Sequence, residues 1–207
     1  MAENGAAAGA ASVRRARADE AERLAEIQEL TIDWGELRNL GWRFHVLLHH
    51  HLITSPDAIC YVAEKDGAVI GYSAWTYDTR RLYAGFRRTY GLRAAFAVLP
   101  RLLNPRNFRP LVRGMTYTKI AQPDDPVAEM LFFSILPEGR HGGVGGLIFR
   151  TMLAEMRQHG VTALKAATVT PGNMPAVKFY ERHGFRKVRT DRFYADTQVD
   201  VYVLDLT

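Results

Sequence analysis

A cluster of glycines in the second half of the chain has the composition of an anion-binding turn. The run Arg140-His141-Gly142-Gly143-Val144-Gly145-Gly146 separates an apolar stretch from the start of an amphipathic one. Glycines let backbone amides approach a ligand closely, and a helix N-terminus adds a partial positive charge to them. The Arg140 side chain can add a full charge. The run therefore predicts a site for a phosphate or diphosphate group, unless it is only a glycine-rich connection.

Two common phosphate-binding motifs do not fit this run. A P-loop ends in Gly-Lys followed by Ser or Thr, and no such triplet closes the run. A dinucleotide-binding turn follows the first strand of its domain and has an acidic residue about 20 positions further on. At about that separation, this chain has Lys165. We therefore expect a different use for the turn.

A second block of residues follows the turn, in and after a predicted short helix. Its spacing is Asn-x-x-Ala-x-x-Phe-Tyr-x-x-x-Gly-Phe, in which the Asn is Asn173 and the Tyr is Tyr180. The first block can be written Arg140-x-x-Gly143-x-Gly145. In this order and on these elements, the two blocks resemble the GNAT superfamily of acyl-CoA N-acyltransferases. The resemblance covers roughly residues 129–187.

The resemblance implies that acetyl-CoA is the cosubstrate and that no metal is needed. The amides of the glycine turn, with the Arg140 side chain, would bind the pyrophosphate. The strand at Phe133, Ser134 and Ile135 would pair with the amides of the pantetheine arm, and a backbone amide near Ile135 would polarise the thioester carbonyl. Asn173 would lie near the same arm. From the residues alone, Asn173 could equally be the N-cap of the helix that follows it.

Two side chains have the chemistry for proton transfer in such a reaction. The resemblance implies that Tyr180 protonates the departing CoA thiolate, and a phenol with a pKa of about 10 is a workable acid for a thiol of about 8.5. Glu129 precedes Arg140 by 11 residues, where some members of the family carry a catalytic base. The residues alone leave other interpretations open. Tyr180 could be a core aromatic beside Phe179, and Glu129 could be an exposed carboxylate at a strand end.

Four histidines, His45, His49, His50 and His51, fall within one predicted helix. His45 and His49 have the i, i+4 spacing of two metal ligands on one helix face, but no cysteine or carboxylate completes a zinc motif. We expect this cluster to be ordinary helix surface. A substrate contact or a proton relay is the alternative, because the resemblance implies that this helix borders the acceptor pocket.

The positive charge of the chain is concentrated between Thr79 and Arg113. The chain has a formal net charge of +5, and this segment contributes +9, so the remainder carries −4. Arginines and apolar residues recur at spacings of three and four, which predicts an amphipathic helix up to Pro100 and turns or extended chain after it. The segment has no Asp, Glu or Lys, and its nine arginines are Arg80, Arg81, Arg87, Arg88, Arg93, Arg101, Arg106, Arg109 and Arg113.

This arginine-rich segment departs from the family pattern, so we interpret it as an insertion before the core strand. It is either a solvent-exposed helix that packs one side against the domain or a binding site for an anionic partner. That partner could be a phosphate-bearing acceptor, an anionic membrane surface or nucleic acid. Nucleic acid is the least favoured, because no recognised nucleic-acid motif accompanies the charge.

The overall composition is that of a soluble globular protein. The chain has 207 residues, of which 47% are hydrophobic and 24% charged, and no apolar run approaches the roughly 20 residues of a membrane span. The single cysteine, Cys60, cannot form an internal disulfide or a cysteine zinc site. We expect a flexible tail over residues 1–11, one domain over residues 12–207, and a cytoplasmic location.

The order of the predicted elements indicates an α/β fold with a mixed sheet of about six to seven strands flanked by helices. The N-terminal half predicts a strand at 12–17, a helix at 21–30 capped by Asp19, a helix at 34–52, a hairpin of 58–64 and 68–77 around Lys65-Asp66-Gly67, and a strand at 115–121. The C-terminal half predicts a strand at 130–136, a helix ending at Gly160, a strand at 163–169, a helix at 175–183 and two strands within 185–206.

These features together predict an N-acetyltransferase in which a primary amine attacks acetyl-CoA directly, with no metal and no covalent enzyme intermediate. The arginines would suit a phosphate-bearing acceptor such as a nucleotide-linked amino sugar, and a peptide or protein amine is the alternative. Two other classes stay open: a catalytically idle acyl-CoA-binding or sensing domain, and a basic interaction module. The sequence sets no oligomeric state.

Overall fold

The computed structural model describes residues 11–32, 40–102, 125–140, 142–170, 172–194 and 197–207. Within them, seven strands form one mixed sheet in the order β1-β2-β3-β4-β5-β7-β6. All neighbouring strands are antiparallel except β4 and β5, which are parallel. The strands are β1 (Ser12–Arg15), β2 (Ala58–Lys65), β3 (Ala68–Thr76), β4 (Glu129–Ile135), β5 (Ala163–Thr170), β6 (Arg186–Tyr194) and β7 (Thr197–Asp205). The predicted α/β fold class is confirmed.

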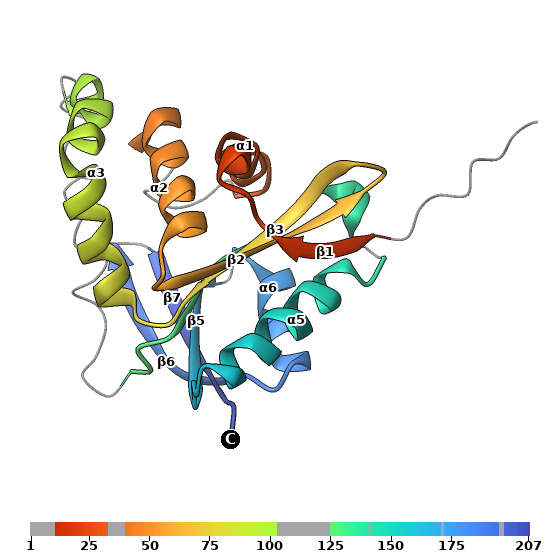
Figure 1. The fold of residues 1–207 in the computed structure, drawn as a ribbon. Helices are drawn as coiled ribbons and strands as arrows, with labels where there is room; N and C mark the ends of the chain where they lie inside the picture. The colour runs from red at the N-terminus through yellow and green to blue at the C-terminus, as the bar shows by residue number, and fades with distance from the viewer. Residues whose placement is uncertain (1–10, 33–39, 103–124, 141, 171, 195–196) are drawn as a thin grey trace, which may run out of the picture.

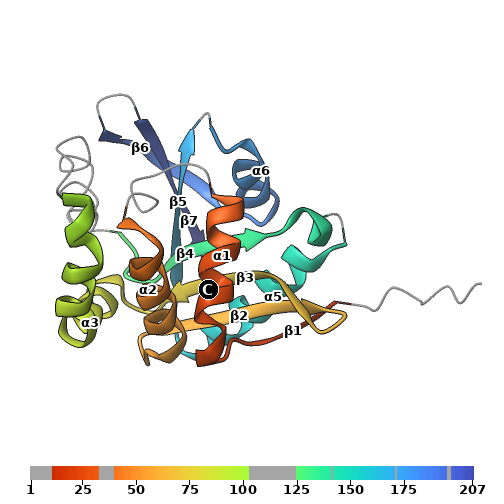
Figure 2. The ribbon, with the colours of Figure 1, turned by 90° about the horizontal axis from the view of Figure 1, so that it is seen from above.

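Helices cover both faces of the sheet (Figures 1 and 2). Helices α1 (Ala21–Thr31), α2 (Trp42–Thr54) and α3 (Thr79–Leu102) lie on one face, with α3 at the outer edge of the group. Helices α5 (Val144–Gln158) and α6 (Met174–Arg182) lie on the other. Two short 3₁₀ turns, η1 (Ala18–Glu20) and η4 (Pro137–Gly139), lead into α1 and follow β4.

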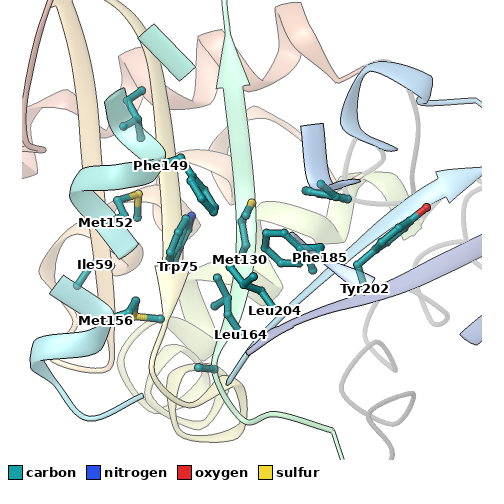
Figure 3. Close-up of a cluster of buried hydrophobic side chains, with 14 of the residues drawn as sticks. Ile59, Trp75, Met130, Phe149, Met152, Met156, Leu164, Phe185, Tyr202 and Leu204 are labelled. Carbon is teal, nitrogen blue, oxygen red and sulfur yellow. The ribbon is translucent and has the colours of Figure 1, made fainter. Parts of the chain in front are cut away.

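The core on the α5 face is continuous from α5 to the far end of the sheet (Figure 3). Helix α5 buries a stripe that includes Ile148, Phe149, Met152 and Met156, at the spacing expected of an amphipathic helix. Phe149 lies 5.5 Å from the buried Trp75 of β3, measured between ring centroids. This packing fixes the start of α5 against the strands next to it.

A tight turn joins β2 to β3 where the sequence predicted it. Asp66 and Gly67 have φ angles of 52° and 79°, which is the left-handed conformation that two-residue hairpin turns require. The hairpin pairs β2 with β3, and the other edge of β3 pairs with β4.

Three of the predicted helix ends differ from the structure for clear reasons. The helix predicted over 34–52 is not continuous: α2 begins at Trp42, because Gly41 has a φ of 89° and a ψ of 160° and cannot be helical. The first part of that prediction, at 34–39, lies outside the described residues. Asp19 lies inside η1, and the cap of α1 is Glu20. Helix α3 continues through Pro100 to Leu102; the proline costs one backbone hydrogen bond, and the turn before it is held by buried Val98.

Some predicted features lie outside the described residues: most of the tail at 1–11, the strand at 115–121, and the part of the arginine-rich segment beyond residue 102. The part from Thr79 to Pro100 is helical, as predicted. Its interpretation as an insertion stays a prediction. No helix in the described part of the chain is long and apolar enough to span a membrane.

Candidate active site

The parallel strands β4 and β5 are paired only at their beginnings. Their register joins Glu129 to Lys165 and Met130 to Ala166, and the pairing stops there. On its other side, β4 stays paired with β3 as far as Ile135. The edge of β4 that faces β5 is therefore unpaired from Leu131 onward, and a polar, extended ligand can add to such an edge by backbone hydrogen bonds.

The backbone direction of β4 identifies which groups face this open edge. The Leu136 amide donates to the Ile70 carbonyl of the β3 side at 2.9 Å. Backbone groups alternate in direction along a strand, so the amides of Phe133 and Ile135 point away from β3. These are two of the residues that the sequence predicted for the pantetheine arm. The Ser134 side chain is buried on the face of the sheet opposite to the Phe133 and Ile135 side chains, beside its register partner Tyr72.

The glycine turn follows β4 and ends at the start of α5. The first backbone bond at this end of the helix runs from the Leu147 amide to the Gly143 carbonyl at 3.1 Å. The amides of Val144, Gly145 and Gly146 come before it and have no acceptor within the helix. These converging donors suit an anion with several oxygens.

Two glycines show why side chains are unfavourable in this turn. A Cβ at Gly145 would lie 3.1 Å from Ile135 Cδ1 and 3.4 Å from Phe133 Cε1, so α5 begins directly against β4. Gly143 has a φ of 72°, and a Cβ there would meet no described atom within 4 Å. The amides of the turn therefore border open space beside the unpaired edge of β4. The residues present fit the diphosphate and amide-rich arm of acetyl-CoA.

Arg140 lies between β4 and the glycines, and its side chain is exposed. Its Nε donates to the Ile135 carbonyl at 3.2 Å, which holds the guanidinium at the open edge of β4. The exposed Gly142 lies between this arginine and Gly143. His141, also predicted for the cofactor site, lies outside the described residues.

Helix α6 spans the gap between β4 and β5. The ring of Phe179 lies 4.8 Å from that of Phe133 on β4. The next residue, Tyr180, is 7% exposed and packs 5.2 Å from both Phe185 and Tyr202. Burial, followed by the charges of Tyr202 and Glu129, raises the pKa of Tyr180 above its usual value. The phenol therefore keeps its proton at neutral pH, as a general acid must.

Asn173 is the N-cap of α6. Its Oδ1 accepts from the Ala176 amide at 3.4 Å, and its Nδ2 donates to Thr168 Oγ1 at 3.0 Å. The side chain thus ties the start of α6 to β5. A contact with the pantetheine arm stays a prediction.

Glu129, at the other end of β4, belongs to a buried group of charges. It is 1% exposed, so the interpretation as an exposed strand-end carboxylate was wrong. Its Oε2 accepts from Thr79 Oγ1 at 2.9 Å and lies 3.4 Å from Lys165 Nζ. Lys165 Nζ is also 3.5 Å from Asp125 Oδ2, and Asp125 pairs with both terminal nitrogens of Arg189. Lys165 therefore compensates the buried charge of Glu129.

Sequence reasoning missed Thr79, Lys165 and Tyr83 as neighbours of Glu129. Burial, and then the charge of Glu129, raises the pKa of Tyr83 on α3, so α3 lies near the site. Lys165 and Glu129 face each other because they are register partners in adjacent strands. Strand order and register are tertiary properties, so no local sequence signal could have found this pair.

The histidine cluster on α2 is largely buried, so its prediction as helix surface was wrong. His49 is 0% exposed; its Nδ1 donates to the His45 carbonyl at 2.8 Å, and its Nε2 accepts from the Tyr72 hydroxyl at 2.8 Å. His51 Nε2 donates to the Leu82 carbonyl of α3 at 3.0 Å. These histidines join α2 to β3 and α3. No group of three or more metal-ligating side chains is placed to hold an ion among the residues described.

Comparison with known proteins agrees with this geometry. A sequence model of the family described as "Acetyltransferase (GNAT) family" matches residues 22–185 of the chain. No curated protein sequence matches the chain.

Solved structures with a similar fold cover nearly the whole chain. A GNAT-family protein from Desulfovibrio desulfuricans has a TM-score of 0.60 and 15% identity, covering 96% of this chain and 100% of that chain. YncA from Salmonella typhimurium, solved with acetyl-CoA, has a TM-score of 0.61 and 14% identity, covering 96% and 95%. NAA60 from Arabidopsis thaliana, solved with a bisubstrate analogue, has a TM-score of 0.61 and 14% identity, covering 94% and 97%. At these identities, the similarity establishes a shared fold.

Proposed function

The chain belongs to the acetyltransferase (GNAT) family and is an acetyl-CoA-dependent N-acetyltransferase, and we propose that it acetylates the primary amine of a small, phosphate-bearing acceptor. The observation that carries the proposed site is the separation of β4 from β5 after their first two paired residues. The glycine turn lies at one end of this gap, and α6 lies across it.

In the proposed site, the amides of Val144, Gly145 and Gly146 bind the pyrophosphate, and Arg140 adds its charge. The Phe133 and Ile135 amides at the open edge of β4 bind the pantetheine arm. The Ile135 amide also stabilises negative charge that develops on the thioester carbonyl. Bound acetyl-CoA supplies a thioester whose thiolate is the leaving group.

Two side chains move the protons in this proposal. Glu129 accepts a proton from the acceptor ammonium, directly or through water, and Lys165 keeps the buried charge compensated. The free amine then forms the new C–N bond as the C–S bond breaks. Tyr180 donates its proton to the departing sulfur and recovers one from solvent or from the acetylated nitrogen. One acetyl group is transferred, and no oxidant or metal takes part.

The proposed acceptor phosphate would meet the start of α3. Thr79, the first residue of α3, donates to Glu129, and Tyr83 responds to the Glu129 charge. Arg80, Tyr83 and Arg87 are spaced i, i+3 and i+7, so they share one face of the helix. Arg80 and Arg87 are exposed and can bind a phosphate close to the proposed base.

A pair of glycines at the two ends of α5 tests the cofactor site. Gly143 and Gly160 have φ angles of 72° and 73°, and a Cβ at either would meet no described atom within 4 Å. Replacing either with Val therefore costs a similar backbone strain, but only Gly143→Val fills the proposed phosphate site. We expect acetyl-CoA to raise the melting temperature of the native protein and of Gly160→Val by several degrees at about 100 times its Kd.

The same measurement on Gly143→Val should show little or no increase. A Gly143→Val protein that is stabilised as much as Gly160→Val would exclude this turn as the pyrophosphate site. Release of CoA thiol on adding a phosphate-bearing amine then tests the transfer itself.

A further inference from the structure

The outward face of α3 carries a stripe of apolar side chains that acetyl transfer does not use. Leu92, Phe96 and Leu99 are 80%, 71% and 50% exposed. Their i, i+4, i+7 spacing places them on one side of the helix. No other helix in the described part of the chain exposes three large apolar side chains.

Arginines flank this stripe. Arg88 precedes Leu92 by one helical turn on the same face, and Arg93 follows it directly; both are exposed. Among the described residues, no carboxylate pairs with either of them, whereas Arg81 lies 3.2 Å from Asp57. The helix itself contains no acidic residue. The face therefore combines unneutralised positive charge with exposed apolar surface.

The opposite side of α3 packs against the rest of the domain. It buries Leu82, Phe86, Ala94 and Val98, and the Tyr90 hydroxyl forms a hydrogen bond with His50 Nδ1 of α2 at 2.7 Å. In both views α3 is the outermost helix of its layer, beyond α2 (Figures 1 and 2). The high exposure of Leu92, Phe96 and Leu99 shows that no described helix covers the stripe.

We propose that this face of α3 docks onto an anionic lipid bilayer. Leu92, Phe96 and Leu99 would enter the boundary between headgroups and acyl chains, and Arg88 and Arg93 would contact the lipid phosphates. A nucleic acid backbone or free phosphate would match the arginines but leave the apolar stripe in water. The inference is independent of the proposed acceptor and of the proposed catalytic roles.

Vesicle sedimentation with the full chain tests the proposal. We expect the protein to bind vesicles of phosphatidylcholine mixed with phosphatidylglycerol, and to bind vesicles of phosphatidylcholine alone far more weakly. Binding should fall as salt rises, because the charge contribution is screened. Equal binding to both kinds of vesicle, or no binding to either, would overturn the proposal.

Matched variants separate the contribution of charge to vesicle binding from that of the apolar side chains. Arg88→Gln/Arg93→Gln should weaken binding about 30-fold, at about fivefold for each arginine. Lys178→Gln/Arg182→Gln removes the same charge from exposed positions on α6 and should change binding less than about twofold.

The apolar contribution decides between a bilayer and another anion. Leu92→Ser/Phe96→Ser/Leu99→Ser should weaken vesicle binding more than about tenfold. These side chains are exposed, so circular dichroism should show an unchanged fold. A triple-serine variant that binds as the native protein does would overturn the proposal in favour of a purely electrostatic partner. If neither the native protein nor the triple-serine variant binds vesicles, and the native protein is a dimer whereas the variant is a monomer, the stripe is instead a contact with a second copy of the chain.

Discussion

The two ends of β4 present different kinds of polar groups. At its C-terminal end, Phe133, Ile135 and the glycine turn offer backbone amides at an open edge. At its N-terminal end, buried Glu129 contacts Thr79 of α3 and Lys165 of β5, and Lys165 also contacts Asp125, which pairs with Arg189 of β6. Backbone donors need only the right turn, whereas a buried carboxylate needs compensating charges brought from distant parts of the chain. The first end is therefore tolerant of side-chain change away from its glycines, and the second is not.

The largest effect on catalysis is expected at Tyr180, the proposed general acid. Tyr180→Phe removes only the hydroxyl from a buried, well-packed ring, so acetyl-CoA binding should be unchanged. The turnover number should fall about 100-fold or more, since proton transfer contributes on that order. Steady-state CoA release and acetyl-CoA-dependent melting measure the two separately.

A Tyr180→Phe protein with unchanged turnover would remove the phenol from the mechanism. If neither protein releases CoA with any amine while both bind acetyl-CoA, the chain is a binding or sensing domain. Thermal stabilisation by acetyl-CoA distinguishes that result from a misassigned cofactor site.

The next largest effect is on stability, at the charged end of β4. Lys165→Met leaves the buried carboxylates of Glu129 and Asp125 with one cation fewer, and should lower the free energy of unfolding by about 3–5 kcal/mol. Arg186→Met is the control, because its pair with Asp205 is 67% and 58% exposed, and should cost less than about 1 kcal/mol. Urea unfolding measures both.

A double variant checks the cause of that loss. Lys165→Met/Glu129→Gln removes one charge of each sign, so it should be more stable than Lys165→Met alone. If the double variant is less stable than both single variants, the lysine stabilises the fold by packing and not by its charge.

The same contrast explains which parts of the site the sequence could predict. The glycine turn and the Asn173–Phe185 block are local patterns, and their backbone geometry follows from glycine spacing and helix capping. The fold class followed equally well from the alternation of elements. The Glu129–Lys165 pair and the buried histidines depend on strand register and helix docking, which involve residues far apart in sequence. The predicted start of α2 was wrong because it depends on the backbone conformation of one residue, Gly41.

A smaller effect, on the KM for the acceptor, is expected from the arginines of α3. Arg80→Gln/Arg87→Gln should raise the KM for a phosphate-bearing amine about 100-fold, because two charge-assisted hydrogen bonds of about 1.5 kcal/mol each are lost. The KM for acetyl-CoA should not change. Arg88→Gln/Arg93→Gln removes the same charge from the outward side of α3 and should leave the acceptor KM in solution nearly unchanged. If the two double variants behave alike, the arginines act only through their long-range field.

The smallest effect is expected at His49, which lies outside both ends of β4. Burial lowers the pKa of His49 to about 4, whereas in the unfolded chain it should be about 6.5. As pH falls below 6.5, the unfolded state takes up the proton first, so the folded state loses stability until the pH passes the folded value. Between pH 7.5 and 5, this loss should be about 2 kcal/mol.

Urea unfolding of His49→Gln at the two pH values tests this assignment. The variant cannot take up the proton, so the difference in stability between the two pH values should shrink by about 2 kcal/mol, whatever its absolute stability. His159→Gln, at the exposed C-cap of α5, is the control and should keep the pH dependence of the native protein. Burial also lowers the pKa of His51. Both variants should therefore keep some dependence of stability on pH. If the dependence persists in full in His49→Gln, the acid sensitivity of the fold comes from elsewhere, and the buried His49–Tyr72 contact only packs α2 against β3.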